Sequence, residues 1–92
     1  MIESFRHKGL QRFFEADDGA RLPPDQLSKI GIILSALDAA GGVEDMRQPY
    51  FRLHALKGDL KGFWAVTVRA NWRIIFRFED GNAVEVNFLD YH

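Results

Sequence analysis

The sequence predicts an α+β fold, in which two helices near the N-terminus pack on one face of a twisted antiparallel β-sheet. In the first forty residues, apolar side chains recur at helical spacing, whereas from Tyr50 onward they alternate as in strands. Only short, turn-forming segments separate the alternating runs, which indicates hairpins rather than crossover helices. With 92 residues, the chain has room for one core, so we expect a single domain over residues 1–92.

The first predicted helix covers "KGLQRFFEA". Leu10, Phe13 and Phe14 recur at positions i, i+3 and i+4, which places them on one helix face. The stretch "DDGA" follows, and Gly19 is the expected left-handed residue that ends the helix. Before this helix, "MIESF" is expected to form a short first strand.

The second predicted helix lies within "PPDQLSKIGIILSALDAA". Its two prolines suit a first helical turn, where no backbone N–H is needed. Leu27, Ile30, Leu34 and Leu37 form its apolar face, and "GG" ends it. The charged stretch 41–49 is expected to be a loop that connects the helices to the sheet.

The alternating runs predict consecutive hairpins. Ala70 and Asn71 alone separate "FWAVTVR" from "WRIIFRF", so a hairpin should span residues 63–79. Asp80-Gly81 then predicts a tight turn into "AVEVNFL". The expected core positions of the sheet are Trp64, Val66, Val68, Ile74, Phe76, Val84, Val86 and Phe88. A two-residue turn that pairs Arg69 with Trp72 offsets this alternation, so some of these side chains should lie on the outer face.

Charge is distributed unevenly along the chain. Residues 51–78 contain six cations and one acid, a net charge of +5, although the whole chain carries −1. This block indicates a local anion site, and the alternative is a merely solvated strand face. The sequence contains no cysteine, no signal-peptide pattern and no apolar run of membrane-spanning length. We therefore expect a cytoplasmic protein without a membrane partner.

Groups that can move protons occur in two places. The last predicted strand leads into Asp90, Tyr91 and His92, and His54 is a second imidazole. No metal-binding, phosphate-loop or nucleophile motif accompanies them. Such a set suits acid–base chemistry on a phosphodiester, with Arg and Lys neutralising the phosphate. A straight strand would point Tyr91 away from Asp90 and His92, so a bend would be needed to unite all three.

The stretch "YFRLHALKGDLKGFWAVTVRANWRIIFRFEDGNAVEVNFLDYH" resembles the C-terminal half of HigB toxins, a branch of the RelE/ParE toxin superfamily. "MIESFRHKGLQRFFE" is similar to the start of those proteins, and "LKGD", "VRANWRI" and "DYH" are the most specific parts. The resemblance implies a RelE-like microbial RNase fold. It also implies a ribosome-dependent endonuclease that cleaves mRNA in the A site by attack of a 2′-OH on the adjacent phosphate, without metal or cofactor.

The same resemblance implies roles for particular residues and partners. The implied catalytic residues are His54, Asp90, Tyr91 and His92, and the implied RNA contacts are Lys57, Arg69, Asn71 and Arg73. The implied partners are the ribosome, mRNA and a HigA-like helix-turn-helix antitoxin. The resemblance implies contact with operator DNA only indirectly, through the complex with this antitoxin.

Two other functions remain open at this point. One is a non-catalytic inhibitor of DNA gyrase on the same scaffold, which the terminal "DYH" disfavours. The other is a plain RNA-binding module, in which the basic block binds RNA without cleaving it.

Overall fold

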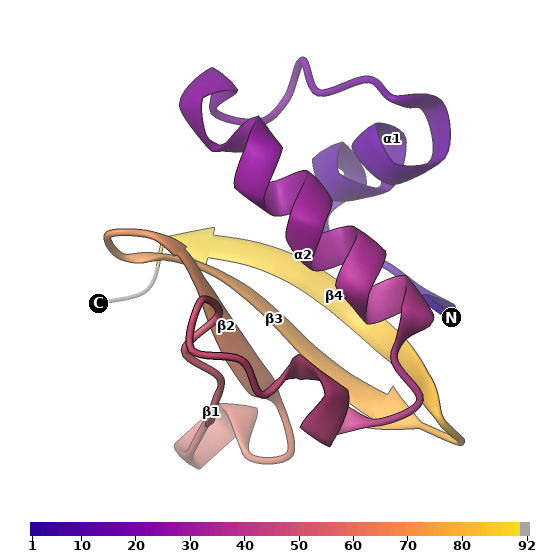
Figure 1. The fold of residues 1–92 in the computed structure, drawn as a ribbon, viewed down its shortest axis with the longest axis vertical. Coiled ribbons are helices and arrows are strands. Elements are labelled where there is room, and N and C mark those ends of the chain that lie inside the picture. Colours follow the sequence, from indigo (N-terminus) through magenta and orange to yellow (C-terminus); the bar gives the residue numbers. More distant parts are fainter. Residues whose placement is uncertain (91–92) are drawn as a thin grey trace.

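Two α-helices lie on one side of a four-stranded antiparallel sheet in the computed structural model, which describes residues 1–90 (Figure 1). The strands are β1 (His54–Ala55), β2 (Trp64–Arg69), β3 (Trp72–Glu79) and β4 (Asn82–Asp90), adjacent in chain order. This arrangement confirms the predicted fold class. Within residues 1–90, no helix is long and apolar enough to cross a bilayer.

Helix α1 (Lys8–Ala16) has the predicted bounds but a different end. Asp17, not Gly19, takes the left-handed conformation, with φ at 56°, and its N–H bonds to two carbonyl groups of the last turn. Asp tolerates this conformation better than most residues because its short polar side chain bonds locally. Gly19 is needed for a close approach instead, since a Cβ there would lie 2.7 Å from a methyl group of Leu27.

Helix α2 (Leu27–Ala39) follows a short 3₁₀ turn, η1 (Pro24–Gln26). Ile30, Leu34 and Leu37 are buried as predicted, whereas Leu27 is only partly buried. Ile33 is also fully buried, so the buried face is wider than the predicted stripe. The expected loop contains a second 3₁₀ turn, η2 (Val43–Met46), which adds Met46 to the core.

The N-terminal segment lies along β4, but the prediction of a regular strand there is wrong. Only isolated parallel bridges form, between Ile2 and Ala83 and between Phe5 and Val86. Between them, Glu85 has a left-handed φ of 54°, and its N–H bonds to the hydroxyl of Ser4 at 2.8 Å. This irregularity in β4 interrupts the ladder, yet the segment still covers an otherwise open sheet edge.

Two β-bulges decide which strand residues reach the main core. Arg69 pairs with Trp72 as predicted, and a register shift between Thr67 and Arg69 then restores the alternation. A second shift at Glu85 pairs Val84 with Arg77, and Val84 is buried as predicted, although it does not belong to the main core cluster. Of the other expected positions, Trp64 packs partly buried against the main core, and Val66, Val68, Ile74, Phe76, Val86 and Phe88 are buried within it.

The opposite face of the sheet carries a smaller core. Leu56, Ala65 and Ile75 form it, and nearby apolar side chains pack around them. A third 3₁₀ turn, η3 (Gly58–Leu60), belongs to the loop that covers this face. The sheet therefore separates a large core beneath the helices from a smaller one beneath a loop.

Candidate functional site

Strand register places His54 on the face opposite the helices. His54 pairs with Ala65, which pairs with Ile75, and side chains of directly opposed residues share a face. Arg73 pairs with Thr67 on the same face, one row nearer the β2–β3 turn. An imidazole and a guanidinium therefore share a surface at the margin of the smaller core.

The imidazole of His54 is exposed and held by one backbone contact. Its Nδ1 lies 3.1 Å from the carbonyl oxygen of Arg52. Because a carbonyl oxygen only accepts, this contact is a hydrogen bond when Nδ1 carries the proton. A neutral His54 with this bond presents an unprotonated Nε2 to solvent, the form that a general base requires.

The backbone that supplies this carbonyl is fixed on both sides. Arg52 has a left-handed φ of 52°, and its N–H donates to the carbonyl of Gln48 at 3.3 Å. The preceding carbonyl, of Phe51, accepts the N–H of Thr67 on β2 at 2.8 Å. Arg52 was not among the predicted site residues, and no sequence signal marks a left-handed arginine in a loop.

Arg73 lies on the same sheet face as His54 and is hydrogen-bonded to the β2–β3 turn. Its Nη1 donates to the carbonyl oxygens of Ala70 at 2.5 Å and Trp72 at 3.3 Å. Its Nε is buried and has no hydrogen-bond partner among residues 1–90. Arg73 thus braces the turn whose second residue, Asn71, is exposed.

The other two implied RNA contacts differ in their availability. Lys57 is exposed at the start of the loop that covers the smaller core. Arg69 forms an ion pair with Asp25 of η1, so its charge already has a carboxylate partner. Arg69 must exchange that partner before it can bind an RNA phosphate.

Asp90 occupies a different part of the sheet from His54. It is exposed at the end of β4 and pairs with Trp72, on the far side of β2 and β3 from β1. Three strand spacings, on the order of 14 Å, separate the lines of β1 and β4. Residues 1–90 therefore do not bring Asp90 beside His54, and the other two implied catalytic residues, Tyr91 and His92, lie outside the described range.

Several cations close to His54 in the sequence, or on its face of the sheet, form no ion pair among the described residues, whereas five other arginines do. The described ion pairs engage Arg6, Arg12, Arg47, Arg69 and Arg77. Hydrogen bonds that Arg77 donates to Glu85 and Glu79 raise the pKa of Arg77. By contrast, Arg52, Lys57, Lys61 and Arg73 form no ion pair within the described part of the chain. Because Asp59 is the one acid among residues 51–78, that segment keeps a net positive charge, which attracts a polyanion.

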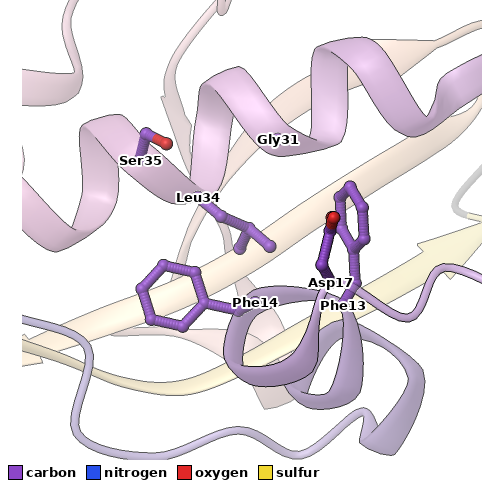
Figure 2. Close-up of a pocket in the computed structure, with 6 residues that line it drawn as sticks. All are labelled: Phe13, Phe14, Asp17, Gly31, Leu34 and Ser35. Carbon is purple, nitrogen blue, oxygen red and sulfur yellow. The ribbon is translucent and has the colours of Figure 1, made fainter.

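A pocket of about 230 Å³ lies elsewhere, between α1 and α2 (Figure 2). Its lining residues are Phe13, Phe14, Asp17, Gly31, Leu34 and Ser35. It combines apolar walls with one carboxylate and one hydroxyl, and it belongs to the helical side of the sheet. Among the described residues, no group of three or more His, Cys, Asp or Glu is arranged to hold a metal ion.

Comparison with known proteins identifies relatives over the whole chain. Residues 3–92 match the family model described as the RelE-like toxin of type II toxin–antitoxin system HigB. The chain is 44% identical to Endoribonuclease HigB from Proteus vulgaris, over 100% of both chains. It is 36% identical to Toxin HigB-1 from Vibrio cholerae, over 100% of this chain and 98% of the relative.

Solved structures share the fold at much lower identity. The YoeB dimer from Staphylococcus aureus matches with a TM-score of 0.61 and 17% identity, over 99% of this chain and 97% of the other. The YoeB/ParE toxin from Agrobacterium tumefaciens matches with a TM-score of 0.53 and 19% identity, over 97% and 99%. At this identity, the likeness establishes the arrangement of helices and strands.

Proposed function

Because the chain belongs to the HigB family of RelE-like toxins of type II toxin–antitoxin systems, we propose that it is a ribosome-dependent endoribonuclease. It cleaves mRNA in the ribosomal A site and thereby inhibits translation. The name of the Proteus vulgaris relative supports RNA cleavage. The structural observation that carries the proposal is an exposed, backbone-anchored His54 on the same sheet face as Arg73, within a segment, residues 51–78, whose net charge is +5.

The proposed reaction is attack of a ribose 2′-OH on the adjacent phosphate. The new bond joins the 2′-oxygen to phosphorus, the bond to the 5′-oxygen breaks, and a 2′,3′-cyclic phosphate forms. One group removes the proton of the 2′-OH, and another gives a proton to the leaving 5′-oxygen. His54 and His92 fill these two roles in our proposal, and both assignments of base and acid are consistent with it.

The remaining site residues act on charge and position. Lys57 and Arg73 neutralise the phosphate as negative charge develops on its oxygens. Asp90 orients His92, Tyr91 positions the RNA, and Asn71 at the exposed turn contacts an unstacked base. Arg69 contributes once it is released from Asp25.

The proposed partners follow from the family. As a type II toxin, the protein has an antitoxin partner. We propose that this antitoxin is a HigA-like helix-turn-helix protein, and that it mediates any contact with operator DNA. The ribosome and its bound mRNA are the proposed targets, which places the protein in the cytoplasm.

The test is to incubate the purified protein with programmed ribosomes and to map the ends of the mRNA. We expect new ends within the A-site codon, and intact mRNA when ribosomes are omitted. Cleavage of free mRNA at the same sites would contradict ribosome dependence. Intact mRNA combined with a block of DNA gyrase supercoiling would favour the non-catalytic alternative.

A further inference from the structure

A group of cations lies beside an exposed aromatic ring, next to the surface that carries His54. Lys29 comes from α2, whereas Tyr50 and Arg52 belong to the loop that leads into β1. The Nζ of Lys29 lies 4.3 Å from the centroid of the Tyr50 ring. Tyr50 is 54% exposed, although large apolar side chains elsewhere in the described chain are mostly buried.

The charges in this group are uncompensated. Burial lowers the pKa of Lys29, and the positive charge of Arg52 lowers it further. Neither cation forms an ion pair with an acid within residues 1–90. Two neighbouring cations without an acid repel each other, and an incoming anion relieves that repulsion.

The combination of an exposed ring and flanking cations fits single-stranded nucleic acid. Aromatic side chains stack on unpaired bases, and Lys or Arg beside them binds the backbone phosphate. Tyr50 offers the stacking surface, and Lys29 and Arg52 offer the phosphate contacts.

Arg52 connects this group to the proposed catalytic surface. Its carbonyl oxygen is the acceptor for Nδ1 of His54, and its side-chain charge reaches Lys29. With its left-handed backbone, φ at 52°, Arg52 contacts His54 through its carbonyl oxygen and acts on Lys29 through its side-chain charge. Arg52 therefore joins the Lys29–Tyr50 pair to the surface that carries His54.

We propose that Lys29, Tyr50 and Arg52 form a second RNA-binding site, which holds a phosphate and an adjacent base. The proposal rests on the function proposed above and adds a contact beyond the residues that the family resemblance implies. In this proposal, the bound RNA runs from the surface that carries His54, past β1, to α2. Messenger RNA and ribosomal RNA offer the same chemistry, and the experiment distinguishes them.

The variants remove one element of the site at a time. Tyr50→Ala removes the ring, Tyr50→Phe retains it, and Lys29→Gln removes a charge. Arg52→Asn removes the other charge while tolerating the left-handed backbone, so the carbonyl contact with His54 is retained. Lys8→Gln is the matched control, because Lys8 is an exposed cation on α1.

Binding is measured separately to a single-stranded RNA oligonucleotide and to ribosomes without mRNA, over a range of salt concentrations. Loss of one stacked base weakens binding by roughly five- to a hundredfold, so Tyr50→Ala should show that loss and Tyr50→Phe should not. Lys29→Gln and Arg52→Asn should each lower the salt slope by about one. Loss with the oligonucleotide identifies messenger RNA as the ligand, and loss only with ribosomes identifies ribosomal RNA.

Cleavage on programmed ribosomes separates this proposal from the proposed function. If the wild type cleaves, and all three loss variants bind both RNAs as the wild type does, the second site is wrong and the function stands. Variants that weaken only the antitoxin complex would show a protein contact and overturn the proposal. A wild type that neither binds nor cleaves would overturn both proposals.

Discussion

His7 and His54 use the same ring nitrogen in opposite ways. Nδ1 of His7 accepts the N–H of Leu10 at 3.1 Å and thereby begins α1, so it carries no proton. Nδ1 of His54 faces a carbonyl oxygen, and this contact is a hydrogen bond when Nδ1 carries a proton. His7 is therefore a structural residue, and its imidazole supplies a control for experiments on His54.

The first prediction concerns the imidazoles of the proposed site. His54→Ala should slow cleavage by roughly 10²- to 10⁴-fold, the usual contribution of a general acid or base. A chain ending at Tyr91, which lacks His92, should show a loss in the same range. Single-turnover cleavage of ribosome-bound mRNA measures both variants.

His7→Asn is the matched control, because asparagine also accepts the capping hydrogen bond. It removes an imidazole from the protein but should leave the cleavage rate unchanged. Full activity of His54→Ala would show that His54 has no role in proton transfer.

The second prediction concerns the dependence of stability on pH. Burial lowers the pKa of His7 below 6.5, and this effect exceeds the opposing effect of its backbone hydrogen bond. As the pH falls through 6.5, the unfolded chain binds a proton that the folded chain resists. The free energy of unfolding should therefore fall as the pH decreases from 6.5, and His7 should contribute no slope well above that value.

Urea unfolding at several values between roughly pH 5 and pH 8 tests this, with His7→Asn as the comparison. The variant retains the cap but cannot titrate, so its stability should change less with pH over that range. Identical slopes for both proteins would assign the pH dependence to other groups.

At the scale of elements, local turn chemistry was predictable and strand offsets were not. Asp80 and Gly81 have φ values of 53° and 81°, as the Asp-Gly pair predicted. The bulges near Arg69 and at Glu85 depend on how two strands and a core fit together, and neither position carries a glycine. The sequence therefore predicted the hairpins, but not the position of the bulge at Glu85.

The third prediction tests this turn. Gly81→Ala should lower the free energy of unfolding by about 1–2 kcal/mol, because an L-residue resists a left-handed backbone. Its new Cβ would lie 3.5 Å from the carbonyl oxygen of Gly41, an ordinary contact, so the loss is conformational. Denaturant unfolding of the variant and the wild type measures the difference.

Gly42→Ala provides the control. Gly42 has an extended φ of −176°, and a Cβ there would meet nothing within 4 Å. The free energy of unfolding of the Gly42→Ala variant should stay near that of the wild type. Equal losses at both positions would show that backbone handedness does not explain the effect at Gly81.

At the scale of the molecule, the sheet separates stability from the proposed chemistry. The helices and the larger core occupy one face, whereas His54 and Arg73 lie on the other. Sequence reasoning and family resemblance together named these residues. Neither method indicated that Arg69 forms an ion pair with Asp25. The two residues are 44 positions apart, and ion pairs at that separation leave no sequence pattern.

The fourth prediction uses that ion pair to change the charge of the surface in both directions. Lys57→Ala should weaken ribosome binding and lower its salt slope by about one. Asp25→Asn should strengthen binding and raise the slope, because it leaves Arg69 free for phosphate. Salt titrations of ribosome binding give both slopes.

Glu44→Gln is the control for Asp25→Asn, since Glu44 forms an exposed ion pair with Arg47 on η2. It releases a guanidinium by the same change of charge, away from the β2–β3 turn. A slope change as large as that of Asp25→Asn would indicate a general effect of net charge rather than the release of Arg69.

The bridges between the N-terminal segment and β4 set the order of events during synthesis. Ser4 and Glu85 are 81 positions apart, so the residues near Ser4 cannot pair until those near Glu85 have been synthesised. Pairing at such sequence separation is slow, because the chain must close a long loop before the contact stabilises it. A nascent chain that lacks residues 83–86 cannot complete this edge. The protein therefore completes its fold only after those residues emerge, and its proposed activity against ribosomes arises only after that point in its own translation.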